Sequence, residues 1–149
     1  MQKSKLVVPF LLMVATAIFV LPTVISLIKG PADTPGVFAN GYTLTQATEL
    51  SQETGKPMLV LATADWCPPC QTLKRTTLMD SAVVEWIMSN TIPVYLEDGE
   101  NSDEIGSLGV GAYPTTMLIQ DGQVLVSLQG AIKANPFISQ LRSAIPVTP

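Results

Sequence analysis

The feature that most restricts how this chain can fold is an uncharged apolar run of 23 residues, at positions 6–28. A helix rises 1.5 Å per residue, so the run spans roughly 35 Å and can cross a hydrocarbon core about 30 Å thick. Lys3 and Lys5 precede it, which favours an N-terminus in the cytoplasm and the rest of the chain outside. We therefore expect residues 1–29 to be a short cytoplasmic stub and a single-pass membrane anchor, with a periplasmic remainder.

A cleaved signal peptide is the alternative for this segment. Its apolar region would be about 7–15 residues long, with a small-residue cleavage site close behind. The best candidate site, Val37-Phe38-Ala39, lies well beyond the run, so an uncleaved anchor is the preferred interpretation. Residues 30–42 carry Pro, Gly and Asn without an apolar period, which predicts a linker. Residues 43–149 are then the folded domain.

Composition excludes several classes of chemistry. The chain has no His and two Cys, which rules out a Ser-His-Asp triad, a His-ligated haem and any zinc site that needs imidazole. Two Cys also cannot supply a four-thiolate cluster on one chain. Residues 30–149 hold 5 basic and 12 acidic residues, a net charge of −7, so the electrostatic footprint of a nucleic-acid-binding protein is missing. No cofactor or metal is implied.

Hydrophobic patterning and turn signals predict an α/β domain. The expected helices cover 46–54 (capped by Thr45), 67–79, a segment from Asp80 or Ser81 to 89, a short stretch after the acidic residues 97–104, and 135–144 (from Asn135-Pro136). The expected strands cover 57–63, 91–96, 115–119 and 123–129, the last two joined by Asp121-Gly122. The order α-β-α-α-β-α-β-β-α predicts a mixed central sheet flanked by helices on both faces. The acidic residues of 97–104 are expected to form a solvated loop.

The segment Trp66-Cys67-Pro68-Pro69-Cys70 follows the first buried strand and opens a helix. Two Cys at i and i+3 share one helical face and can form a disulfide. Free N–H groups and the helix dipole at the N-terminus stabilise a thiolate, which makes Cys67 the expected nucleophile and Cys70 the resolving thiol. A structural disulfide and a soft-metal site, such as one for copper, are the alternatives. A four-residue loop stabilises little, and further metal ligands are not evident.

The chain resembles the thioredoxin family in the order strand, WCxxC and helix, followed by Tyr113-Pro114-Thr115. Residues 55–67 and 78–83 are similar to the C-terminal thioredoxin-like domain of DsbD-type thiol:disulfide interchange proteins. The resemblance implies a thioredoxin fold and makes Trp66 the residue that shields the site. It also implies that Pro114 is a cis-proline facing the disulfide. Pro68, Pro69, Tyr113 and Thr115 complete the expected shell around the Cys pair.

Two positions depart from the family. A buried acid usually stands six residues before the first Cys, where this chain has Leu61, and the DsbD-type domain has Glu seven residues after it, where this chain has Lys74. Lys74 shares a helix face with Cys67 and could favour a thiolate, although a solvated surface lysine is the more ordinary interpretation. How Cys70 loses its proton is therefore open, with water or neutral Lys74 as candidates.

The sequence thus predicts a membrane-tethered, extracytoplasmic protein-disulfide reductase. Its expected partners, by resemblance, are disulfide-containing proteins and a membrane electron donor of the DsbD or CcdA type, and cytochrome c maturation is the process in which its target would lie. Pro68 and Pro69 lack N–H donors toward Cys67, which disfavours the thiolate and favours a reductant. An oxidase or isomerase and a copper-handling assembly factor remain the alternatives.

Overall fold

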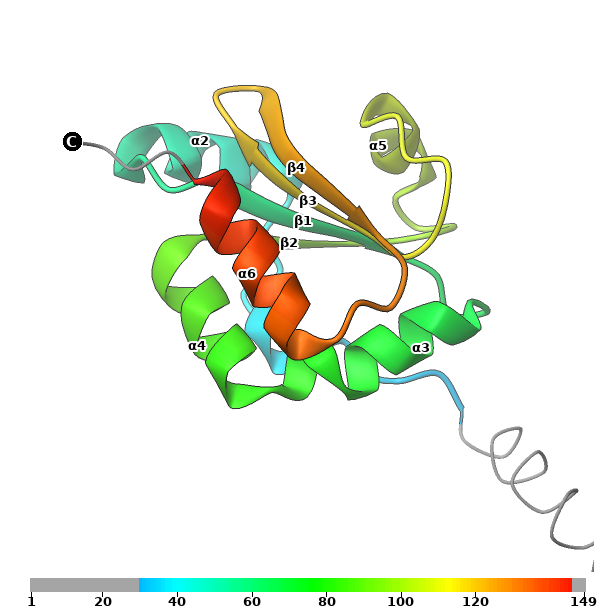
Figure 1. Ribbon diagram of the computed structural model, residues 1–149. Coiled ribbons are helices and arrows are strands. Elements are labelled where there is room, and N and C mark those ends of the chain that lie inside the picture. The colour runs from blue at the N-terminus through cyan, green and yellow to red at the C-terminus, as the bar shows by residue number, and fades with distance from the viewer. Residues whose placement is uncertain (1–29, 146–149) are drawn as a thin grey trace, which may run out of the picture. The chain divides into compact units, whose positions relative to one another are not determined.

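Four strands form one mixed sheet in the computed structural model, which describes residues 30–145 (Figure 1). The strands are β1 (Met58–Thr63), β2 (Ile92–Glu97), β3 (Thr115–Gln120) and β4 (Gln123–Gln129), in the spatial order β2-β1-β3-β4. β1 pairs parallel with β2 and antiparallel with β3, and β3 pairs antiparallel with β4. β1 is buried at every position because it is central and covered on both faces.

Helices cover both faces of the sheet, as the element order predicts. The helices are α2 (Leu44–Thr54), α3 (Pro68–Arg75), α4 (Ser81–Asn90), α5 (Ser102–Ser107) and α6 (Ala134–Ala144), with short 3-10 helices η1 (Gly36–Phe38) and η2 (Thr77–Met79). One core cluster joins one sheet face to α3, α4 and α6; the other joins the opposite face to α2 and α5. Leu61 lies in the first cluster and its neighbour Val60 in the second, because side chains alternate along a strand. The α/β prediction and the order of its elements are confirmed.

Two helix starts differ from the sequence prediction. Thr43, not Thr45, caps α2: its hydroxyl accepts from Gln46 N at 3.2 Å, and the Gln46 side chain accepts from Thr43 N at 3.0 Å. α6 begins at Ala134, with Lys133 rather than Asn135 at the N-cap. Pro136 is then the third helical residue, where its missing N–H costs no intrahelical bond.

The predicted helix 67–79 is broken at Thr76, whose φ and ψ are −121° and −77°. The Thr76 hydroxyl donates to the carbonyl of Thr72 at 2.7 Å, and the Thr77 hydroxyl donates to the carbonyl of Ile132. Threonine side chains that bond backbone carbonyls compete with helical continuation. A tertiary contact thus separates α3 from η2.

The N-terminal part of the described chain corrects the linker assignment of residues 30–42. Val37 and Phe38 in η1 are buried in the core, and the Phe38 ring lies 5.7 Å from that of Tyr95. Residues 32–145 belong to one compact unit. The predicted anchor at 6–28 lies outside the described residues. Within 30–145, the helices are too short or too polar to span a bilayer.

Candidate functional site

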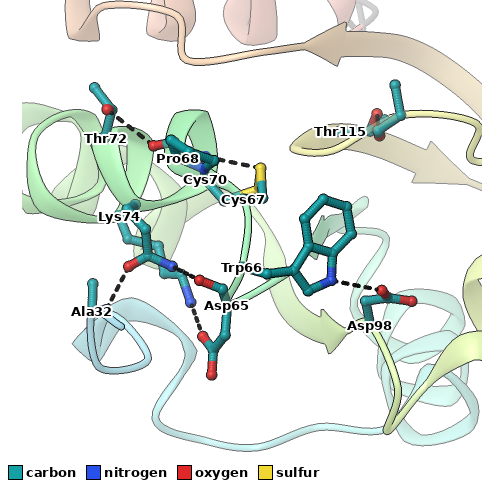
Figure 2. Close-up of a disulfide and its surroundings, with 12 residues drawn as sticks. Ala32, Asp65, Trp66, Cys67, Pro68, Cys70, Thr72, Lys74, Asp98 and Thr115 are labelled. Atoms are coloured by element: carbon teal, nitrogen blue, oxygen red, sulfur yellow. Dashed lines mark hydrogen bonds and ion pairs between the residues drawn. A yellow bond between two sulfur atoms is a disulfide. The ribbon is translucent and has the colours of Figure 1, made fainter. Parts of the chain in front are cut away.

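The two cysteines stand at the start of α3 and form a disulfide (Figure 2). Cys67 is the N-cap of the helix, Pro68 and Pro69 are its first two residues, and Cys70 follows. The Cα atoms of Cys67 and Cys70 are 5.2 Å apart, and the Cys70 N–H donates to the Cys67 sulfur at 3.2 Å. Cys67 is 3% exposed and Cys70 is fully buried. The pair is therefore placed as the sequence predicts, with the deeper sulfur on Cys70.

Burial of Cys70 has a local cause. Ala64, directly after β1, clusters with both cysteines and Tyr113, and the Cys67 N–H donates to the carbonyl of Ala64 at 3.2 Å. The loop from β1 into α3 is thus tied to the strand from which it emerges. The chemistry that this permits is attack through Cys67, with Cys70 held one helical turn behind it.

An aromatic rim lies beside the cysteines. Trp66 is 71% exposed, and its ring meets that of Tyr113 edge-on with centroids 5.9 Å apart. Asp98 joins the two rings: its Oδ2 accepts from Trp66 Nε1 and its Oδ1 accepts from the Tyr113 hydroxyl, both at 3.1 Å. Burial and the hydrogen bond to Asp98 raise the pKa of Tyr113, so its hydroxyl stays protonated. Three loops are thereby fastened at one edge of the site.

The loop before β3 supplies the remaining predicted shell. The Tyr113–Pro114 peptide bond is cis, as the family resemblance implies. Pro114 and Thr115 are buried, and the Thr115 hydroxyl donates to the carbonyl of Ala112 at 2.7 Å. In the view of Figure 2, α3 lies on the left, Trp66 in the centre and Thr115 on the right. The structure therefore brings Tyr113 to the cysteines, while the Thr115 hydroxyl is used within its own loop.

Lys74 is not a solvated surface lysine, which corrects the ordinary interpretation of its sequence position. It is 2% exposed, and its ammonium lies 2.8 Å from the Tyr95 hydroxyl, 3.1 Å from Asp65 Oδ1 and 3.7 Å from Glu97 Oε2. Burial alone lowers the pKa of Lys74, but the hydrogen bonds to Tyr95 and Asp65 outweigh it and hold that pKa above its ordinary value. Neutral Lys74 is therefore a poor candidate for the proton acceptor.

The residues that meet Lys74 form a polar cluster under α3 that sequence reasoning missed. Tyr95 and Glu97 stand two residues apart in β2, so both side chains lie on the sheet face that holds Leu61. The Tyr95 hydroxyl donates to Glu97 Oε2 at 2.7 Å. Glu97 was expected in a solvated loop, but its side chain is only 14% exposed. The signal that could have found it is the i, i+2 spacing from Tyr95 on a predicted strand.

Within residues 30–145, the His, Cys, Asp and Glu side chains do not gather in groups of three or more that could hold a metal ion.

Residues 39–121 match the thioredoxin-like family. A curated relative, thioredoxin Y of the rice chloroplast (Oryza sativa subsp. japonica), is 30% identical over 112 residues, which cover 74% of this chain. An Arabidopsis thaliana relative, chloroplastic thioredoxin Y2, is 27% identical over 110 residues. The chain spans 64% of the length of each of these two relatives.

Solved structures show the same fold. The DsbH oxidoreductase superposes with a TM-score of 0.62 at 20% identity, covering 69% of this chain and 81% of that one. The C-terminal domain of DsbD from Neisseria meningitidis, in its oxidised form, has a TM-score of 0.58 at 22% identity. That alignment covers 78% of this chain and the whole of the DsbD domain. At these identities the likeness shows a shared architecture.

Proposed function

We propose that this chain, which belongs to the thioredoxin-like family, is a membrane-tethered thiol–disulfide oxidoreductase that reduces protein disulfides outside the cytoplasm. The observation that carries this is the Cys67–Cys70 disulfide at the N-terminus of α3. In each cycle the Cys67 thiolate attacks a target disulfide and forms a mixed disulfide, and one target thiolate leaves. Cys70 then displaces the second target thiolate and restores the Cys67–Cys70 bond. The target gains two electrons and the pair loses two.

The reductive direction is supported by the donors around Cys67. A strong oxidant is one whose reduced, thiolate form is stabilised. Pro68 and Pro69 have no N–H, so Cys70 alone among the first three helical residues offers one to the Cys67 sulfur. Lys74 adds little positive potential, because Asp65 and Glu97 compensate its charge. Both features leave the thiolate less stabilised and the disulfide form more so.

Tethering is supported by the apolar run at residues 6–28 and the lysines before it. A reductase outside the cytoplasm needs electrons from within, so its donor is a membrane carrier of the DsbD or CcdA type. An apocytochrome whose haem-attachment cysteines must be reduced is the target class that fits a tethered reductase.

The first test is the Cys67–Cys70 reduction potential of the full chain in detergent, equilibrated in glutathione and dithiothreitol buffers. We expect a value near that of thioredoxin, about −270 mV. A value above about −180 mV would instead identify an oxidase or isomerase. Insulin reduction gives the activity readout: Cys67→Ser abolishes it, whereas Cys70→Ser accumulates a mixed disulfide.

The second test concerns the tether. We expect the full chain to stay with membranes through alkaline carbonate extraction and a matched chain without residues 1–29 to be released. In spheroplasts of a bacterial host, a membrane-impermeant thiol reagent should label the reduced full chain. Extraction of the full chain by carbonate, or protection of its thiols from that reagent, would refute the proposed anchoring.

A further inference from the structure

The resolving thiol has no direct route to bulk water. Cys70 is fully buried, yet its thiol must lose a proton before it can attack the mixed disulfide. The position six residues before Cys67 holds Leu61, which is itself fully buried and cannot accept a proton. If the proposed function holds, another group inside the protein has to take the proton from Cys70.

Two buried oxygens under α3 are unsatisfied among the described residues. They are Oε1 of Glu97 and the hydroxyl of Thr63, neither of which has a hydrogen-bond partner. Thr63 and Glu97 are register partners in the parallel β1–β2 pair, so their side chains lie side by side on one sheet face. The other Glu97 oxygen is occupied, because Oε2 accepts from Tyr95 at 2.7 Å and lies 3.7 Å from Lys74. Leaving buried polar atoms unpaired destabilises the folded state, so a role for them is expected.

Two contacts link this pair to the turn that carries Cys70. Thr63 directly precedes Ala64, which packs against Cys70. Lys74 follows Cys70 by one helical turn on the same face of α3, and its ammonium reaches the Glu97 carboxylate. The residue next to Thr63 thus contacts Cys70, and the helix that bears Cys70 reaches Glu97 through Lys74.

We propose that Glu97 accepts the proton of Cys70 during resolution of the mixed disulfide, with the Thr63 hydroxyl between them as relay. The Cys70 thiol gives its proton to Glu97 Oε1, and the new thiolate forms the Cys67–Cys70 bond. The target thiolate that leaves then takes the proton, so Glu97 returns to its ionised form. No other oxidant or reductant is needed.

Two other polar groups around Glu97 act as positioning residues. Lys74 comes from α3 and Tyr95 from β2, and both lie against Oε2. The exposed Asp65 carboxylate of the β1–α3 loop pairs with Lys74 instead. A lysine ammonium only donates hydrogen bonds and a tyrosine hydroxyl both donates and accepts, so the chain runs from Lys74 through Tyr95 to Glu97. That direction orients the carboxylate with Oε1 free for the proton.

The test follows two kinetic phases in one reaction. The reduced full chain, in detergent, is mixed with one equivalent of the disulfide DTNB, which releases a coloured thiolate when Cys67 attacks and a second when Cys70 resolves. For Glu97→Gln we expect the first phase to stay within about twofold of wild type, while the second slows by about 100-fold at pH 7, the lower range for loss of a general base. The second phase of the variant should also rise more steeply with pH than that of wild type.

The matched control is Asp65→Asn, which removes an equal charge beside Lys74 from a side chain that is 55% exposed. It should leave both phases within about twofold. Equal slowing by the two variants, or a wild-type second phase and pH profile in Glu97→Gln, would overturn the proposal. Should Glu97→Gln fail to fold, Thr63→Val decides: selective slowing of the second phase supports the relay and an unchanged second phase overturns it. Release of no thiolate by the wild type would instead refute the proposed function, and the inference would fall with it.

Discussion

Glu97 and Asp98 are adjacent, half-buried carboxylates at the point where β2 ends, and they have different partners. Glu97 points under α3, where its side chain is 14% exposed and shares Lys74 with Asp65. Asp98 points to the rim, where it accepts hydrogen bonds from the exposed Trp66 and from Tyr113. Glu97 is the last residue of β2 and faces α3, whereas Asp98 begins the turn that follows and faces the rim.

The different partners predict how much each carboxylate contributes to stability. A charge withdrawn from water must be compensated by a partner, and removal of either partner leaves the other uncompensated. A charge at a wet rim keeps its hydration and gains little net free energy from its hydrogen bonds. We therefore expect Glu97 to matter for stability and proton transfer, and Asp98 to matter for the shape of the rim.

The largest expected effect is a loss of stability on removal of the Glu97 carboxylate. Glu97→Ala should lower the free energy of unfolding by about 2–3 kcal/mol. Breaking a fully buried ion pair costs about 3–5 kcal/mol, and the loss here is smaller because Lys74 still has its ion pair with Asp65. Asp98→Ala should cost less than about 1 kcal/mol. Urea unfolding of the oxidised full chain measures both.

Glu100→Ala serves as the control for removing an acidic residue from an acidic chain. Glu100 is exposed two residues further on, so we expect a change within about 0.5 kcal/mol. Equal losses in Glu97→Ala and Asp98→Ala would show that the two carboxylates do not differ in environment.

The second prediction is that the polar cluster around Glu97 makes the free energy of unfolding depend on alkaline pH. Because the folded-state pKa of Lys74 lies above its ordinary value of 10.5, its contribution to stability is complete below about pH 10.5 and is lost as pH rises through the folded pKa. Burial raises the pKa of Tyr95 above its ordinary value of 10.0, so Tyr95 also contributes a loss of stability as the pH rises above 10.0. The free energy of unfolding should therefore fall from pH 10 to pH 12.

Two variants separate these contributions. Lys74→Met should make the alkaline fall shallower, and Tyr95→Phe should remove the tyrosine part of it. An alkaline profile in Lys74→Met that coincides with that of wild type would mean that the ammonium gains nothing from its partners in the folded state.

The smallest effect on stability is expected at the rim. Trp66→Phe keeps a ring but loses the donor to Asp98, and the exposed position predicts a change within about 0.5 kcal/mol. If Trp66 contacts the target, KM for a protein disulfide should rise about fivefold to tenfold, equivalent to about 1–1.4 kcal/mol of binding. Insulin reduction at varied substrate concentration measures this.

The chain's second tryptophan is the matched control. Trp86 is 9% exposed and belongs to the core beneath α4, so Trp86→Phe should lower stability and leave KM within about twofold. A KM effect of equal size in both variants would show that Trp66 makes no contact of its own with the target.

The element order and the Cys site were predictable because they depend on local chemistry. An apolar run with a hairpin signal identifies strands, and two Cys at i and i+3 after a buried strand identify a helix start. Boundaries were less predictable: Thr43 and Thr45 are both acceptable caps by composition, and the Gln46 side chain selects Thr43. The burial of Val37 and Phe38 was missed because a short 3-10 helix has no apolar period.

The sequence by itself determined the fold class and the position of the Cys pair, since each follows from patterns within single elements and from their order. Only the tertiary structure shows that Lys74 and Glu97 are withdrawn from solvent and paired. They lie on different elements, and the sequence alone suggests that both are surface charges. Their meeting depends on the β1–β2 register and on how α3 crosses β2. Pairing across elements compensates the charges, and no local pattern encodes it.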